Sequence, residues 1–168
     1  KTYSVPGNFQ FLKIVFRNII SSLRYKVQTK FYFDQWILLY SFHQPGSFLQ
    51  EPGIFKRLLP PPDRFWADPF VVYRDNKYFV FFEELIYNKK GEKGHLSVME
   101  LTNDGSISTP QIILQKPYHL SYPFIFEHED KWYMIPESSD NATIQLYECI
   151  NFPYQWKFKM NLIENIKA

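Results

Sequence analysis

The sequence has few of the features that hold a small domain together covalently or carry it across a membrane. Cys149 is the only cysteine in 168 residues, so the chain cannot form an internal disulfide. A single cysteine favours a reducing compartment, such as the cytoplasm. No apolar run reaches the ~18 residues that a membrane-spanning helix needs. We therefore expect the chain to fold around a packed apolar core.

The sequence also lacks a strong charge and the usual cofactor motifs. Nineteen Lys and Arg against 17 Asp and Glu leave a net charge of +2, so we expect no nucleic-acid partner. We find neither a glycine-rich phosphate loop nor a Gly-x-Ser-x-Gly elbow. His43, His95 and His128 are isolated, and no His or carboxylate spacing predicts a zinc site. We expect neither a metal nor a cofactor.

Aromatic residues are abundant. They make up 20% of the chain, with 17 Phe, 12 Tyr and 4 Trp, and 12 Pro supply frequent turns. Aromatic side chains favour pleated, half-buried surfaces. The composition therefore predicts a strand-rich globular domain.

Residues 1–32 differ from the rest and predict a helix. Leu12, Val15, Phe16, Ile19 and Leu23 recur at helical spacing, and the segment is basic through Lys13, Arg17, Arg24, Lys26 and Lys30. One interpretation is a linker helix that packs its apolar stripe on a neighbouring domain. The other is peripheral contact with an anionic membrane surface.

From residue 33 onward the pattern indicates strands. Residues 35–42 form an aromatic-rich apolar run that predicts a buried strand. Residues 66–84 predict strand, turn and strand, with the turn at 74–77. Residues 94–101 and 111–114 predict a third and a fourth strand.

This pattern repeats after 54 positions. Pro69 then falls on Pro123, Phe70 on Phe124, and Glu83 on Glu137. The second copy is completed by predicted strands at 143–148 and near 156–163. A repeat of about 50 residues with four strands is typical of a β-propeller blade. We expect an all-β fold: part of a five-bladed β-propeller over 33–168, with about two blades, an extra strand and an N-terminal helix.

Two blades are fewer than the roughly four to eight of typical propellers. We therefore expect the natural polypeptide to continue beyond Ala168. The expected partners are the remaining blades or a neighbouring transferase domain.

Three motifs carry a family resemblance: RFWADPFVVYRDNKYFVFFEE (64–84), HLSYPFIFEHEDKWYMIPES (119–138) and FPYQWKF (152–158). They resemble the N-terminal propeller domain of plant glucosamine inositolphosphorylceramide transferases. They are similar also to bacterial relatives joined to formyltransferase-like or glycosyltransferase domains. That domain resembles the arabinanase, levansucrase and invertase superfamily of five-bladed propellers. The resemblance covers about residues 33–168, and residues 1–32 resemble the connector to a preceding domain.

The resemblance implies a role for Asp68. In those glycosidases an aspartate at the start of the first blade acts as nucleophile or base, and the Trp66-x-Asp68-Pro69 context matches it. The equivalent position in the second copy is Tyr122, where invertase-like enzymes often carry a second aspartate. The general acid would fall in a later blade, so the resemblance alone does not imply hydrolysis.

The residues themselves suggest a sugar site. Glycoside cleavage needs two carboxyl groups, and Asp68 is the best candidate for one, because Trp66 and Phe70 predict an apolar setting. The alternative is a structural carboxylate that bonds backbone amides. Arg64, His119 and Tyr122, with Trp66, flank the strand starts and are candidates for sugar binding.

Three further residues are ambiguous or structural. Glu83 and Glu137 are candidates for substrate contact, but a glutamate repeated in both copies is better explained by a role in the blade. Cys149 ends a strand and is expected to be a buried thiol rather than a nucleophile.

Three functions remain open from the sequence. The leading one is a carbohydrate-recognising propeller domain within a larger sugar-modifying protein of the glycosyl- or formyltransferase-like kind, with a glycan or sugar-containing substrate as its ligand. The first alternative is a glycoside hydrolase-like catalytic propeller that uses Asp68. The second is a structural platform for protein interaction, since the fold does not determine function.

Overall fold

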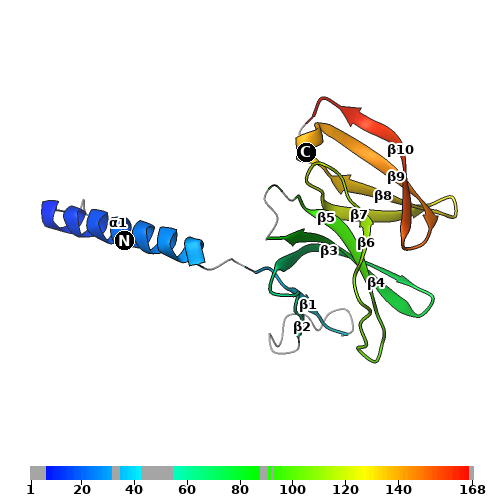
Figure 1. Cartoon of the computed structure of the whole chain (residues 1–168), viewed down its shortest axis with the longest axis horizontal. Helices are drawn as coiled ribbons and strands as arrows, with labels where there is room; N and C mark the ends of the chain where they lie inside the picture. The colour runs from blue at the N-terminus through cyan, green and yellow to red at the C-terminus, as the bar shows by residue number, and fades with distance from the viewer. Residues whose placement is uncertain (1–6, 32–34, 43–54, 88–90, 92, 167–168) are drawn as a thin grey trace, which may run out of the picture. The chain divides into compact units, whose positions relative to one another are not determined.

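The computed structural model describes residues 7–31, 35–42, 55–87, 91 and 93–166, apart from the side chains of 28–31. The chain divides into two compact units, Lys1–Asp34 and Gln35–Ala168. The boundary predicted between residues 32 and 33 lies outside the described residues. The first unit is helical, and the β-strands belong to the second (Figure 1). The predicted all-β class with an N-terminal helix is confirmed.

The first unit is helix α1 (Asn8–Phe31), a single uninterrupted helix of 24 residues. Its first hydrogen bond runs from the Phe11 amide to the Gly7 carbonyl at 2.9 Å, so the helix begins beside Gly7. In the part of the chain that the structure describes, no helix has both the length and the apolar character to cross a membrane. The role of the helix as a linker stays a prediction.

The second unit contains three antiparallel sheets (Figure 1). The two-stranded sheet pairs β1 (Leu38–Tyr40) with β2 (Lys56–Leu58). The first four-stranded sheet has the order β3 (Arg64–Arg74), β4 (Lys77–Ile86), β5 (His95–Leu101) and β6 (Gln111–Leu114). The second has the order β7 (Ser121–His128), β8 (Lys131–Glu137), β9 (Thr143–Asn151) and β10 (Gln155–Glu164), with the short 3-10 helix η2 (Ser139–Asn141) after β8.

The 54-residue repeat is present in the backbone as well as in the sequence. The pairing Ala67↔Glu83 of the first sheet recurs as Ser121↔Glu137 in the second. Both first strands carry a bulge after that pair: the ladder resumes only at Phe70 in β3 and at Phe124 in β7. In each bulge two residues face one on the partner strand, and the second of the two is a proline, which has no N–H to leave unpaired.

The predicted turn at 74–77 is confirmed as a two-residue hairpin. Arg74 pairs with Lys77, and both central residues have positive φ, 51° at Asp75 and 62° at Asn76. Positive φ at both positions suits the right-handed twist of the flanking strands, and Asp and Asn tolerate it well. The second sheet repeats this geometry at Glu129 and Asp130.

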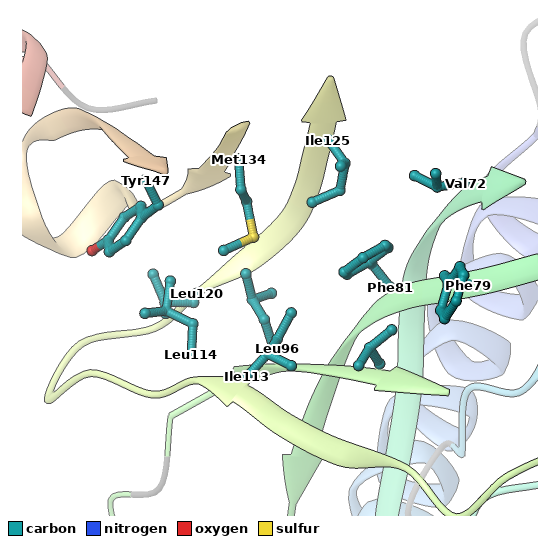
Figure 2. Packing of buried hydrophobic residues seen from close by; sticks show 11 residues of the cluster. Val72, Phe79, Phe81, Leu96, Ile113, Leu114, Leu120, Ile125, Met134 and Tyr147 are labelled. Atoms are coloured by element: carbon teal, nitrogen blue, oxygen red, sulfur yellow. The ribbon is translucent and has the colours of Figure 1, made fainter. Parts of the chain in front are cut away.

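Two apolar clusters lie on the two faces of the first sheet. Phe81 belongs to the larger cluster, which fills the space between the two four-stranded sheets (Figure 2). Phe82, its neighbour in β4, points the other way and packs with Leu38 and Leu58 of the two-stranded sheet. The first sheet is therefore covered on both faces, and its central strand is buried from Phe79 to Glu84.

The prediction of a buried strand at 35–42 is only partly right. A strand is present at Leu38–Tyr40, but of these three residues only Leu38 is buried. Trp36, Leu39 and Phe42 are exposed. A two-stranded sheet has one covered face, so alternate apolar side chains along β1 point away from the core.

The two clusters should be separable by mutation. Phe81→Ala and Phe82→Ala each leave a large cavity, and each is expected to lower the free energy of unfolding by about 3–5 kcal/mol in urea titrations. In hydrogen exchange, Phe81→Ala should speed exchange in β7 and β8, whereas Phe82→Ala should speed it in β1. The exposed Val71→Ala serves as the control. Identical exchange patterns in the two variants would contradict two separate clusters.

Candidate functional site

The predicted Asp68 and Tyr122 occupy equivalent positions on neighbouring strands. Each is the first residue of its bulge, with φ of 48° at Asp68 and 42° at Tyr122, and each side chain is exposed. Strands β3 and β7 lie side by side, and the rings of Phe70 and Phe124 meet edge to face at 5.5 Å. The bulges thus present their side chains from adjacent strands at the same level of the two sheets.

Asp68 lies in a groove of about 460 Å³, which we call the Trp36 groove. Its lining includes Trp36, Phe65, Trp66, Asp68, Pro69 and Glu83. The Trp36 side chain is 66% exposed, which is unusual for the largest aromatic residue. A neighbouring cavity of about 310 Å³ is lined without any charged side chain, so we place the candidate site in the groove.

Trp36 is anchored through its backbone. Its carbonyl accepts a hydrogen bond from the Trp66 amide at 3.2 Å. The preceding Gln35 side chain donates to the carbonyls of Pro61 and Arg64, at 2.8 and 2.9 Å. The backbone of Trp36 is therefore fixed beside the groove, while its side chain is largely exposed.

Apolar residues line the groove around Asp68, but the Asp68 side chain is exposed. Simple alternation would place Trp66, Asp68 and Phe70 on one face of the strand. The bulge after Ala67 breaks that alternation and turns Asp68 outward, where its side chain is exposed.

Glu84 is the centre of a buried hydrogen-bond network. Its Oε1 accepts from the Trp66 indole at 3.0 Å and from Arg64 at 3.1 Å. Its Oε2 lies 2.9 Å from the Ser97 hydroxyl and 3.0 Å from His95 Nε2. Arg64 also forms an ion pair with Asp63, at 2.8 Å.

These bonds decide the charge state of Glu84. Burial alone raises the pKa of the carboxyl, but hydrogen bonds from His95, Trp66, Arg64 and Ser97 outweigh it and lower the pKa to about 2. The other ring nitrogen of His95, Nδ1, makes no hydrogen bond to any described residue. Within the described residues it is the single buried side-chain nitrogen or oxygen without a partner. Arg64 and Trp66, which the sequence suggested as candidates for sugar binding, thus use their polar side-chain atoms to bind Glu84.

Glu83 and the predicted His119 form a second pair on the opposite face of β4. His119 Nε2 lies 3.1 Å from Glu83 Oε1, and the carboxylate raises the pKa of His119. The Gly94 amide donates to His119 Nδ1 at 3.0 Å, a bond that only the neutral ring accepts. The imidazole therefore bridges β4 and the start of β5.

Gly94 is the residue at which the segment before β5 comes closest to Glu83, His119 and Leu120. A Cβ there would lie 2.6 Å from His119 Cε1, 2.7 Å from Glu83 Oε1 and 2.9 Å from the Leu120 carbonyl oxygen. The Leu120 amide in turn donates to the Gly94 carbonyl at 2.9 Å. Only glycine fits without displacing these groups.

The structure brings some of the candidates together and leaves others apart. Arg64 and Trp66 meet at Glu84, and Glu83 meets His119, while Trp66, Asp68 and Glu83 share the lining of the groove. Glu137 is exposed at the end of β8. Cys149 is half-buried, and burial raises its pKa to about 11, so it is a thiol at neutral pH.

Sequence reasoning missed Trp36, Glu84 and Gly94 as site residues. The pair of adjacent glutamates at 83 and 84 was a signal, because alternation sends one of them to each face of a strand. Within the described part of the chain, no group of three or more His, Cys, Asp or Glu is arranged to hold a metal ion.

These features define an all-β domain made of repeated four-stranded sheets. The chain belongs to the family described as "Glucosamine inositolphosphorylceramide transferase 1, N-terminal", whose model matches residues 59–166. It is 33% identical over 104 residues to glucosamine inositolphosphorylceramide transferase 1 of Oryza sativa, in both subspecies indica and japonica. Identity to the Arabidopsis thaliana protein of that name is 31% over 104 residues.

The match covers only a small part of these relatives. It includes 61% of this chain but 14% of the rice proteins and 13% of the Arabidopsis protein. No solved structure matches the chain significantly. The comparisons therefore establish the family of this domain.

Glu84 should make the domain sensitive to acid. Its pKa is below the ordinary value of 4.5 in the folded state, so its stabilising effect is present above that value and lost as pH falls toward 2. Glu84→Gln is expected to lower the free energy of unfolding by about 3 kcal/mol at neutral pH. That deficit should shrink by about 2 kcal/mol near pH 3, as measured by urea denaturation.

The exposed Glu127→Gln is the control for this measurement and should unfold like the wild type at both pH values. A deficit for Glu84→Gln that stays constant with pH would show that the carboxylate charge is not the stabilising feature.

Gly94→Ala should disturb the junction between the sheets. The added methyl group meets a backbone carbonyl and two side chains, so we expect a loss of about 1–3 kcal/mol in thermal unfolding. The His119 imidazole signals in NMR should shift as the ring is displaced. Gly7→Ala is the control, since a Cβ at that position meets nothing within 4 Å. An unchanged melting temperature would contradict the close approach at Gly94.

Proposed function

We propose that residues 35–168 form part of a β-propeller that recognises a sugar-containing ligand within a larger sugar-modifying protein. The support for the propeller is the repeat: two successive four-stranded meanders share the same bulge, the same hairpin turn and the same pairing. Their first strands lie side by side, as the innermost strands of neighbouring blades do.

The observation that carries the sugar-binding role is the exposed Trp36 in a groove with two carboxylates. Sugar rings offer an apolar C–H face to an aromatic ring, and hydroxyl groups that donate hydrogen bonds. Trp36 supplies the open aromatic face, and Asp68 supplies acceptor oxygens in the same groove. Glu83 is the second carboxylate of the lining, held in place by His119.

A recognition role is better supported than catalysis. Strained backbone at a carboxylate is one sign of an active site. Here the positive φ of Asp68 recurs at Tyr122, which has no carboxylate, so it belongs to the repeated bulge and not to a reaction. Asp68 is also exposed, while Glu83 is engaged by His119.

The names of the relatives suggest where to search for the ligand. Those proteins are called glucosamine inositolphosphorylceramide transferases, so we propose a transferase of that general kind as the larger protein. A glucosamine-containing glycan or an inositol phosphate headgroup is then the first ligand to try.

The test is glycan binding by the full chain. The protein is applied to an array that includes glucosamine glycans and inositol phosphate headgroups, and the hits are measured by calorimetry. Trp36→Ala should weaken binding at least about tenfold, as expected for an anchoring tryptophan. Phe158→Ala, an exposed aromatic on β10, is the matched control and should bind like the wild type.

The Asp68→Asn variant distinguishes recognition from catalysis. A binding module should retain measurable affinity, because an amide oxygen still accepts hydrogen bonds. Turnover of a bound glycoside that disappears in Asp68→Asn would instead support the hydrolase alternative. A chain that binds no sugar on the array would overturn the proposal and favour the interaction platform.

A further inference from the structure

Helix α1 has a charge pattern unlike that of the rest of the chain. Its 24 residues contain no Asp or Glu, although the chain has 17 of these residues. Five of the 19 Lys and Arg lie in the helix: Lys13, Arg17, Arg24, Lys26 and Lys30. The helix is therefore strongly positive, while the remainder of the chain has more acidic than basic residues.

One face of the helix is continuously apolar. Phe9, Leu12, Phe16, Ile19 and Leu23 recur at spacings of three and four, so they lie on the same side of α1. All five side chains are exposed, and α1 is the one described element of its unit. An apolar face of this length needs a covering surface that its own unit does not supply.

Cations border this apolar face. Lys13, Arg17 and Arg24 follow one another along one edge of the face at helical spacing. Lys13 lies over the ring of Phe9, with its Nζ 4.8 Å from the ring centroid, so this cation borders the apolar face directly. Long basic side chains at the edge of an apolar face can keep their charges in water while the face is buried.

We propose that α1 lies flat on an anionic lipid surface, with Phe9, Leu12, Phe16, Ile19 and Leu23 in the interface. Charge complementarity selects this partner. A basic helix without carboxylates, with cations bordering a continuous row of large apolar residues, is the kind that binds the headgroup boundary of anionic bilayers. Nearby Lys and Arg strengthen this binding by attraction to the negative surface. The contact is peripheral and does not depend on the sugar-binding proposal.

The test is co-sedimentation of the full chain with vesicles. One set contains equal parts of phosphatidylcholine and phosphatidylserine, and the other contains phosphatidylcholine alone. We expect binding to the anionic vesicles, weak binding to the neutral ones, and a loss of affinity at high salt. Replacing Lys13, Arg17 and Arg24 together by Gln should reduce binding on the order of a hundredfold, because each cation contributes about fivefold.

The apolar face has a matched control on the same helix. Phe16→Gln with Ile19→Gln removes one Phe and one Ile, 66% and 52% exposed, from the proposed interface. Phe11→Gln with Ile14→Gln removes the same residue types, 57% and 45% exposed, from the opposite side of α1. The first pair should lower vesicle binding at least about tenfold, while the second pair should leave it nearly unchanged.

Three results would overturn the proposal. The first is a full chain that fails to bind anionic vesicles at low salt. The second is an equal loss of binding in the two double variants, which would mean that the face has no role. The third is a lowered melting temperature of the chain in Phe16→Gln with Ile19→Gln but unchanged vesicle binding, which would place the face against protein. Circular dichroism of each variant checks that the helix and the sheets are retained.

Discussion

The structure depends on one strand that is covered on both sides. In β4 successive side chains point to opposite faces, so Phe81 enters the cluster between the four-stranded sheets and Phe82 enters the cluster beneath the two-stranded sheet. The same alternation continues into the charged end of the strand. Glu83 meets His119 on one side, and Glu84 meets Trp66 and Arg64 on the other. The two buried carboxylates thus continue the two-sided burial of β4, and their polar contacts link this strand to its neighbours.

Nearly all polar groups at the Glu84 end of the first four-stranded sheet form hydrogen bonds. Glu84 is inaccessible, and four donors compensate for its burial, which keeps it ionised in a site that would otherwise favour the neutral acid. Trp66 donates its indole N–H to this carboxylate, and its backbone amide bonds to Trp36. The backbone of the exposed Trp36 is therefore linked, through Trp66 of β3, to the hydrogen-bond network around Glu84.

Much of the fold could be predicted from the sequence because it depends on local patterns. The strand Gln111–Leu114 and the turn at Asp75 and Asn76 were predicted at the residues where they occur. The 54-residue repeat is visible in the spacing of prolines, aromatic residues and glutamates. The strand pairing of the backbone repeats at the same spacing. Family membership followed from the same motifs.

Features that depend on distant residues could not be predicted in this way. The partners of Glu84 come from positions 64, 66, 95 and 97, which only the register of three strands brings together. The closeness of Gly94 to Leu120 and His119 arises where two sheets meet. The outward position of Asp68 depends on a bulge that interrupts the strand at that residue, whereas alternation assumes an unbroken ladder.

The shared bulge also separates the shape of the backbone from the identity of the side chain that it presents. Aspartate at 68 and tyrosine at 122 adopt nearly the same left-handed conformation, although such a conformation disfavours residues other than glycine, asparagine and aspartate. The structure around each bulge must compensate for the energetic cost of this conformation. The same scaffold thus carries two different exposed side chains at equivalent points, so the chemistry of this surface can differ from one repeat to the next while the backbone stays the same.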